Sequence, residues 1–486
     1  MEAISDARIG PRSVRGSHKK AGRTWFPLLG AGAAIIGTMA AINSIPDDPQ
    51  PRGVLFWPAL WCCLGLLTAP LIGLRKQITS ALRTENLLMV GLVYWLLLDL
   101  LQGAYPLTGI YYDDVVLAFT AVGLMAAGIW IGTLGVGWPL PNLVVRVMEE
   151  PLSNDGLFLA LWASFLLGVF YYAYSSDFDP AVMIAGLGAC RFCAPWARGA
   201  LGGSDAFIEH LKYFGYSLPA LTVLIAHRDG WVRPRAILGI IMSIVIIAFL
   251  VQEGGRRVVG VVVGSGLLTW MLLQGRITGK MVIGGFVAIV IVLFGLEQIL
   301  HYRSQGFAQS NSSLQSLQPS LDDAVDGAVV HVDDNFFRLS QMVRLFPDVQ
   351  SYVDFQPLFY AAVMPVPRVL WPGKPTDVGY DLAKLLSAKG VSLTQSIIGE
   401  LYAMHGLLVV FIGGFVYGRM ANMWNKILAI RGNVGKPMIY GLGAMVLFVG
   451  LRSLVDLVIM SYGVLGWLVL AKLLPRAKSG TVAKPG

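Results

Sequence analysis

The feature that most constrains this chain is a series of long apolar segments, which recur from Trp25 to Leu474. Each has about 17 to 25 residues, enough for a helix to cross the roughly 30 Å hydrocarbon core of a bilayer. Of the 486 residues, 55% are hydrophobic and 14% are charged, whereas a soluble domain carries about 25% charged residues. Because a helix satisfies its own backbone polar groups in lipid, the chain is predicted to be an all-α polytopic membrane protein.

About twelve transmembrane helices are predicted from these segments. They lie near residues 25–43, 54–74, 86–103, 115–138, 156–174, 213–226, 236–251, 258–273, 281–300, 397–418, 437–451 and 453–473. The sixth is the weakest, since it is short and contains Pro219, and residues 181–187 are an alternative re-entrant or interfacial piece. The first is too long for the apolar region of a cleaved signal peptide and is interpreted as an anchor. Residues 25–474 thus form the transmembrane domain, between tails 1–24 and 475–486.

Lys and Arg residues predict the orientation of the helices, because they collect in short cytoplasmic loops. If the basic tail 1–24 is cytoplasmic and successive helices cross the membrane in alternate directions, the second tail is also cytoplasmic. The cytoplasmic loops then contain Arg75, Lys76, Arg83, Arg146, Arg228, Arg233, Arg235, Arg276, Lys280, Arg419, Lys426, Arg431 and Lys436. Both termini are therefore predicted to be cytoplasmic, and the two longest loops, 175–212 and 301–396, to be extracytoplasmic. This topology accounts for the net charge of +8 without a nucleic-acid partner.

The large extracytoplasmic loop 301–396, between the ninth and tenth predicted helices, combines irregular and helical sequence. Residues 305–320 are rich in Ser and Gln and lack periodicity, which indicates a mobile segment. The later stretch NFFRLSQMVRLF predicts a helix lying on the outer bilayer surface, with Asp334 as its N-cap and Pro347 at its end. Its apolar face comprises Phe336, Leu339, Val343 and Phe346. A second short helix is predicted over residues 381–388, closed by Gly390.

Ionisable residues within the predicted helices collect near their outer ends. Four carboxylates lie within about two turns of those ends, and none lies at a cytoplasmic end or near the midplane. They are Asp99, Glu297, Glu400 and Asp456, and the outer helix junctions carry Arg256, Arg257 and Arg452. Each residue alone can be explained by its side chain reaching water, but a secondary transporter would place carboxylates near the midplane. We therefore expect chemistry at the outer membrane surface.

The outer loops also break the usual depletion of basic residues. They contain Arg191, Arg198, Arg303, Arg338, Arg344, Arg368, Lys374, Lys384 and Lys389. Long loops are partly exempt from the charge rule, so each residue alone has a simple explanation. As a group, they favour an anionic ligand, and guanidinium groups match the oxygens of a diphosphate in a bidentate manner.

The four cysteines do not form a framework of disulfides. Cys62 and Cys63 lie within the second predicted helix and are interpreted as buried apolar side chains. Cys190 and Cys193 lie close together in an outer loop and are candidates for a disulfide. A zinc site is rejected, because only His210 lies within easy sequence reach of that pair. No metal or other cofactor is predicted.

The stretch MPVPRVLWPGKPTDVGY, followed by SIIGELYAMHG, resembles bacterial oligosaccharide repeat-unit polymerases, also called O-antigen polymerases. The matching elements are Pro367–Arg368, Trp371–Pro372, Lys374–Pro375, Gly399–Glu400 with Tyr402, and Gly406. Upstream, residues 253–257, EGGRR, resemble the Gly-Arg turn between two middle helices of that family. The close resemblance covers about a sixth of the chain, and the chain lacks the clean pair of similar Arg-rich loops that some members have.

The resemblance implies transfer of a glycan from undecaprenyl diphosphate to the sugar end of another lipid-linked repeat unit, at the outer face of the bacterial cytoplasmic membrane. The lipid-linked oligosaccharide and the bilayer are then the partners, together with a chain-length regulator and a flippase. Stabilisation of the leaving diphosphate requires cations, and the attacking hydroxyl requires a base. The expected diphosphate ligands are Arg191, Arg256, Arg257, Arg368 and Lys374; the base is Glu400 or His405; Trp371 and Tyr402 contact the glycan.

Three alternatives stay open. An O-antigen ligase would use the same donor, and a lipid-phosphate-sugar glycosyltransferase would use acidic residues in its first outer loop, where Asp47 and Asp48 occur. A flippase for lipid-linked oligosaccharide is the non-enzymatic alternative, but it needs a charged cavity reaching both faces.

Glu400 and His405 are expected to face different sides of one continuous helix, since five residues turn the helix by about 140°.

Overall fold

All regular secondary structure in the described part of the chain is helical, as predicted. The structure, a computed structural model, describes residues 25–74, 78–149, 152–190, 193–197, 208–253, 256–274, 284–285, 287, 295, 332–366, 370–375, 378–386, 393, 395–430 and 435–475. The elements are α1 (Trp25–Ile42), α2 (Phe56–Leu74), α3 (Ile78–Ala81), α4 (Thr84–Leu92), the π-helix η1 (Val93–Leu97), α5 (Leu98–Gln102), α6 (Tyr112–Gly132), α7 (Asn142–Glu149), α8 (Asn154–Ser175), α9 (Pro180–Leu187), the 3-10 helix η3 (His210–Ser217), α11 (Leu218–Asp229), α12 (Pro234–Gln252), α13 (Arg256–Leu273), α17 (Asn335–Leu345), α18 (Gln356–Val363), α19 (Leu382–Leu385), α20 (Ser396–Ala429), α21 (Lys436–Gly450) and α22 (Leu454–Leu473).

Eight helices in the described part are long and apolar enough to cross a membrane. They are α1, α2, the continuous helix Thr84–Gln102, α6, α8, α12, α20 and α22, while Arg257–Leu273 and α21 are shorter apolar helices. The predicted sixth helix instead consists of η3 and the twelve-residue α11, which joins it directly. The predicted ninth helix, 281–300, lies almost wholly outside the described residues, so the count of about twelve stays a prediction.

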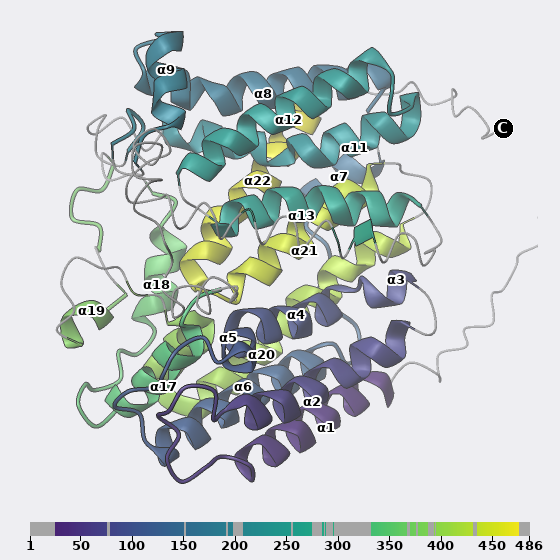
Figure 1. Cartoon of the computed structure of the whole chain (residues 1–486). Coiled ribbons are helices and arrows are strands. Elements are labelled where there is room, and N and C mark those ends of the chain that lie inside the picture. The colour runs from purple at the N-terminus through teal and green to yellow at the C-terminus, as the bar shows by residue number, and fades with distance from the viewer. Residues whose placement is uncertain are drawn as a thin grey trace, which may run out of the picture.

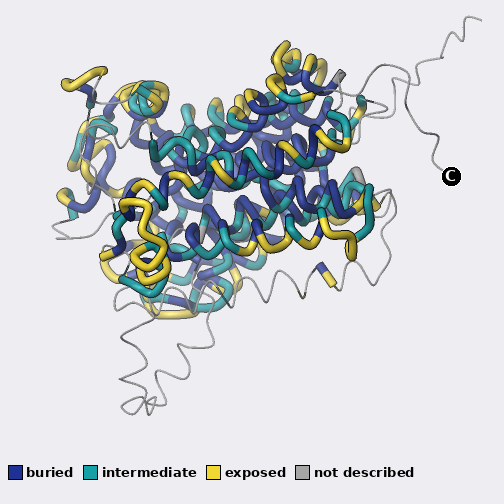
Figure 2. Tube along the Cα trace, turned by 90° about the horizontal axis from the view of Figure 1, so that it is seen from above, coloured by how far each residue is buried: buried dark blue, intermediate teal, exposed yellow. Residues whose placement is uncertain are grey.

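The long helices form two groups that α21 joins (Figure 1). The first group contains α1, α2, α4, α6 and α20, and the second contains α8, η3, α11, α12, α13 and α22. α21 packs against α20 and α4 on one side and against α13 and α22 on the other. Figure 2 shows buried turns along the bundle and exposed turns on its outer faces and connections.

The two ends of the bundle differ. At one end, here called the loop end, lie α9, α17, α18 and α19 (Figure 1). At the opposite end, the tail end, lies α3, and the described chain leaves the bundle there at Pro475. The predicted extracytoplasmic loops thus share one end, and the side of a membrane that this end faces remains a prediction.

α17 forms where a helix was predicted, but it does not lie on a bilayer surface. Phe336 and Leu339 are fully buried and Val343 is 4% exposed, because α17 packs between α6 and α20. The ring of Phe336 lies 4.8 Å from that of Phe119 in α6. Asp334 occupies the N-cap position without a capping hydrogen bond and pairs with Arg338 instead. The surface-helix prediction is therefore wrong, since protein covers the apolar face.

The short helix that was predicted over residues 381–388 is α19, and it is shorter than predicted. Its N-cap is Asp381, whose side chain accepts a hydrogen bond from the N–H of Lys384 (3.1 Å). Residues 387–390, which include the expected cap Gly390, lie outside the described residues, as do residues 305–320.

The contact between α6 and α20 is the most extensive in the bundle and depends on glycine. A Cβ on Gly418 would lie 2.0 Å from the carbonyl oxygen of Ile129, and one on Gly132 would lie 2.2 Å from that of Phe415. The two backbones therefore touch, as small residues allow in membrane helices.

Replacing Gly418 by Ala is expected to separate α6 from α20 and to destabilise the protein by about 1–3 kcal/mol, a typical cost of overpacking. Gly32 in α1 is the matched control, because a Cβ there meets nothing within 4 Å. Gly32→Ala should leave stability unchanged or raise it by up to about 1 kcal/mol. Thermal unfolding in detergent checks both variants, and equal melting temperatures would show that the glycine contact is not needed.

Candidate functional site

α20 is broken at His405 and Gly406, where the backbone leaves the helical conformation. Gly406 has a φ of +69°, which favours glycine because it lacks a Cβ. The chain then doubles back: a Cβ on Gly413 would lie 2.4 Å from Leu401 Cδ1, although these positions would be about 18 Å apart in a straight helix. Residues 396–404 therefore lie beside the start of the second part of α20.

This first part of α20 is held against the connection between α21 and α22. The N–H of Ile397 donates to the carbonyl of Leu451 (3.0 Å). The N–H of Leu454 donates to Oε2 of Glu400 (2.8 Å), which satisfies one amide that the start of α22 would leave unpaired. Glu400 is only 4% exposed, so the predicted base is buried between two helices and also acts as a helix cap.

Next to Glu400 lies the Asp456 cluster, which consists of Arg257, Asp333, Arg452 and Asp456. Asp456 is 1% exposed and accepts from Nη1 of Arg257 (2.8 Å) and from Nη1 of Arg452 (2.9 Å). Nε of Arg452 reaches Asp333 at 2.5 Å. Burial alone would lower the pKa of Arg452, but Asp333 and Asp456 outweigh burial and raise this pKa above its usual range. Arg452 therefore stays charged, and the cluster joins α13, α22 and the segment before α17.

Asp99 attaches the same segment to α5. Its carboxylate accepts from the N–H of Val332 (3.1 Å) and from the N–H of Asp333 (3.2 Å). The side chain of Asn335 donates to the carbonyl of Trp95 (3.1 Å). Asp99, Glu400 and Asp456 thus gather at the loop end, as their sequence positions predicted, and all three are tied to neighbouring segments.

Arg257 is the cation of the cluster that is best placed to bind a further anion. Its side chain is 30% exposed, against 14% for Arg452. Among the described residues, its hydrogen bonds go to Asp456 alone, through Nη1. A guanidinium has five N–H donors, so the remaining edge of Arg257 can hold two phosphate oxygens in a bidentate manner.

His405, the alternative base, has different surroundings. It is 45% exposed, its Nε2 lies 3.2 Å from Oδ1 of Asp354, and its ring neighbours Tyr352 and Phe355. Glu400 and His405 therefore point apart, as predicted. The expected reason, one continuous helix, is wrong because α20 breaks at His405.

Lys374, a predicted diphosphate ligand, holds its own loop together. It is 8% exposed, and Nζ donates to the carbonyls of Met364 (2.8 Å) and Val366 (3.0 Å), just after α18. Trp371 is 37% exposed with its ring 6.4 Å from that of Phe359, whereas Tyr402 is buried. No sequence pattern indicated that Lys374 has this structural role.

Several predicted residues cannot be placed. Arg191, Arg368 and Glu297 lie outside the described residues, and for Arg256 only the backbone, at the start of α13, is described. Their roles stay predictions.

Cys190 and Cys193 form a disulfide, and Cys62 and Cys63 are buried free thiols as expected. In the described part, no three His, Cys, Asp or Glu side chains converge as a metal site would require.

Tyr417 was not predicted and lies beside the same carboxylates. It is 3% exposed, and its hydroxyl lies against Gly450, within electrostatic range of Glu400 and Asp456. This hydroxyl is buried and has no hydrogen-bond partner in the described part of the chain. Only the doubling back of α20 brings Tyr417 next to Glu400, so no sequence pattern indicated that the two are neighbours.

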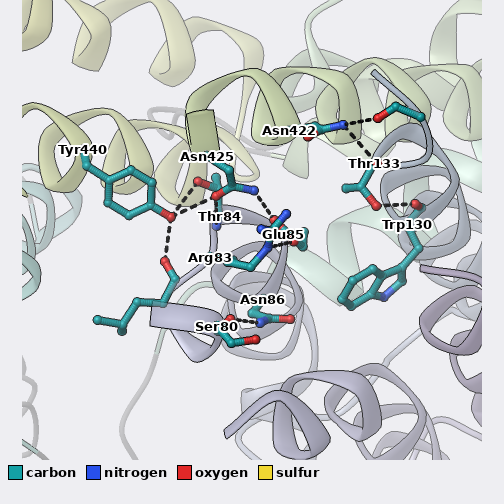
Figure 3. A network of polar contacts seen from close by, with 12 residues as sticks. Ser80, Arg83, Thr84, Glu85, Asn86, Trp130, Thr133, Asn422, Asn425 and Tyr440 are labelled. Atoms are coloured by element: carbon teal, nitrogen blue, oxygen red, sulfur yellow. Dashed lines mark hydrogen bonds and ion pairs between the residues drawn. The ribbon is translucent and has the colours of Figure 1, made fainter. Parts of the chain in front are cut away.

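A second buried polar network, also not predicted, lies at the tail end (Figure 3). Glu85 is 3% exposed, pairs with Arg83 and accepts from the side chain of Asn425 in α20. Asn425 Oδ1 in turn accepts from the N–H of Thr84 (2.9 Å) and lies 3.1 Å from the hydroxyl of Tyr440, whose proton goes to the carbonyl of Leu82. The expectation that no membrane carboxylate lies at this end is wrong, because the predicted helix began one residue after Glu85.

Comparison with known proteins gives one partial match. A family model described as a domain of unknown function, DUF8712, matches residues 239–455. The matched segment includes Arg257, Glu400 and Arg452 and ends one residue before Asp456. No curated protein and no solved structure matches the chain.

Asp456→Asn is expected to destabilise the protein by about 3–5 kcal/mol, because two buried or half-buried arginines lose their shared carboxylate. Asp155→Asn is the control, since the side chain of Asp155 is 87% exposed in its pair with Arg235. That change should stay within about 0.5 kcal/mol. Thermal unfolding distinguishes them, and a small effect of Asp456→Asn would mean that the cluster does not hold the bundle together.

Tyr417→Phe is expected to keep or raise stability, because an unpaired buried hydroxyl is removed. Tyr440→Phe should instead lower stability by about 1 kcal/mol, since the Tyr440 hydroxyl donates to the carbonyl of Leu82 (2.6 Å). The same unfolding measurement applies, and equal losses in both variants would show that the Tyr417 hydroxyl has a partner.

Proposed function

We propose that this chain is a metal-independent membrane glycosyltransferase that polymerises undecaprenyl-diphosphate-linked oligosaccharide repeat units. The observation that carries the proposal is a buried carboxylate, Glu400, that lies beside the ion pairs of Arg257 and Arg452 with Asp456 at the loop end. Glu400 lies within electrostatic range of Arg452 and Asp456, and Arg257 keeps one edge of its guanidinium for an anion. A base and a diphosphate site next to each other are what this transfer needs.

In the proposed reaction, a sugar hydroxyl of one lipid-linked unit attacks the anomeric carbon of another. The new C–O glycosidic bond forms as the bond from that carbon to the diphosphate oxygen breaks. The hydroxyl proton passes to Glu400, and the diphosphate leaves with the electron pair of the broken bond. Arg257 stabilises the charge that develops on the leaving diphosphate, while Asp456 keeps the guanidinium in place.

The loop end would face the periplasmic side of the bacterial cytoplasmic membrane. Basic residues at the tail-end connections support this orientation, and lipid-linked donors require no nucleotide sugar on that side. The product would be O-antigen, capsule or exopolysaccharide, with a flippase and a chain-length regulator as partners. An O-antigen ligase shares this site chemistry and differs in the molecule that receives the glycan.

A flippase for lipid-linked oligosaccharide is the second candidate, and one observation favours it. The network around Glu85 places buried charge at the tail end as well as at the loop end, as a path between both faces would require. Disruption of the gene separates the candidates: loss of a polymerase leaves surface glycan with a single repeat unit. Loss of a ligase or flippase leaves none, with lipid-linked units accumulating outside or inside respectively.

Glu400→Gln is expected to abolish long polymer while the protein still folds. The amide oxygen of Gln can still accept the hydrogen bond from Leu454, but it cannot take the proton, and a general base contributes about 10²- to 10⁴-fold to the rate. The surface glycan ladder of cells carrying the variant measures the result. Normal polymer lengths would rule out Glu400 as the base, and Glu400→Ala, which also loses the cap, shows the cost of destabilisation.

A further inference from the structure

A buried lysine lies at the end of α12 and has no role in the proposed reaction. Lys212, in η3, is 6% exposed, and its Nζ lies 2.9 Å from Glu209 and 3.0 Å from Glu253. An ammonium group held in this way is costly to bury unless both carboxylates stay in place.

Both carboxylate oxygens of Glu253 are occupied. Oε2 accepts from Lys212, and Oε1 accepts from the hydroxyl of Tyr172 in α8 (2.8 Å). Glu253 is the C-cap residue of α12, and Arg257 is the second residue of α13. Four residues of chain span at most about 14 Å, so fixing Glu253 restricts where Arg257 can lie.

Gln252, the neighbour of Glu253, ties a third segment to the same point. Its Oε1 accepts from the indole N–H of Trp196 (2.5 Å), and its Nε2 donates to the carbonyl of Cys190 (3.3 Å). The carbonyl belongs to the Cys190–Cys193 disulfide loop. The end of α12 is therefore held by η3, by α8 and by this loop at once.

Arg257, in α13, forms an ion pair with Asp456 in α22. Tyr216, one turn beyond Lys212 in η3, is fully buried and lies within electrostatic range of both Lys212 and Arg257. The lysine site and the Asp456 cluster are thus neighbours, linked along the chain from Glu253 to Arg257 and through η3.

We propose that Lys212 is a positioning residue, which through Glu253 fixes the end of α12 so that Arg257, at the start of α13, meets both Asp456 and the substrate diphosphate. The diphosphate part of this inference rests on the proposed function, whereas the link between Lys212 and Arg257 does not. Lys212 touches no reacting atom in this scheme. Its effect passes through the placement of Arg257.

The first test needs no substrate and measures thermal unfolding of Lys212→Met, Arg257→Gln and the double variant. If Lys212 acts through Arg257, the double variant loses at least about 2 °C less than the sum of the single losses, a coupling of the size expected for linked residues. Strictly additive losses would overturn the link. Arg235→Met is the matched control, because Arg235 lies at the other end of α12 in an exposed ion pair and should add independently.

The second test measures binding of undecaprenyl diphosphate to the full chain in nanodiscs. Lys212→Met should weaken binding about tenfold and Lys212→Arg much less, while Lys212→Met should have no further effect in the Arg257→Gln background. A further loss in that background would show that Lys212 contacts the ligand or acts elsewhere, against the proposal. Absence of binding by the wild-type protein would overturn the proposed function, and the unfolding experiment would still decide whether Lys212 positions Arg257.

Discussion

The structure depends above all on the neutralisation of two arginines by one buried carboxylate. Asp456 meets Arg257 from α13 and Arg452 from the connection before α22, and Arg452 also holds Asp333 of the loop segment. A buried ion pair is only weakly favourable in net terms, but removal of one member leaves an uncompensated charge. The same interaction that fixes the loop end also presents the free edge of Arg257, so stability and the anion binding that we propose draw on the same residues.

α20 makes contacts at the loop end, in the middle and at the tail end of the bundle. Its first part carries Glu400 beside the Asp456 cluster, its middle packs on α6 through Gly414 and Gly418, and its last turns supply Asn425 to the tail-end network. Hydrogen bonds and charges hold its two ends, and close backbone packing holds its middle. Between helices in lipid, such packing replaces the hydrophobic driving force of soluble cores.

Local sequence predicted most of the helices and the gathering of Asp99, Glu400 and Asp456 at one end. It did not predict their partners, because Asp333 and Arg452 are 119 positions apart and Asp99 and Val332 are 233 apart. The apolar stripe of α17 was assigned to lipid, since apolar periodicity is the same whether lipid or protein covers it. Glu85 was missed because helix boundaries are uncertain by a few residues. The break at Gly406 was missed because glycine also occurs within ordinary membrane helices.

The doubling back of α20 has a consequence for how the protein is made. Residues 396–404 form hydrogen bonds to Leu451 and Leu454, in segments that leave the ribosome after α20 itself. Glu400 therefore acquires its surroundings only when α21 and α22 have entered the membrane, and Asp456 arrives last of the charged group. Biogenesis thus keeps Glu400 apart from Arg452 and Asp456 until the chain is almost complete, which couples the assembly of the loop end to the completion of insertion.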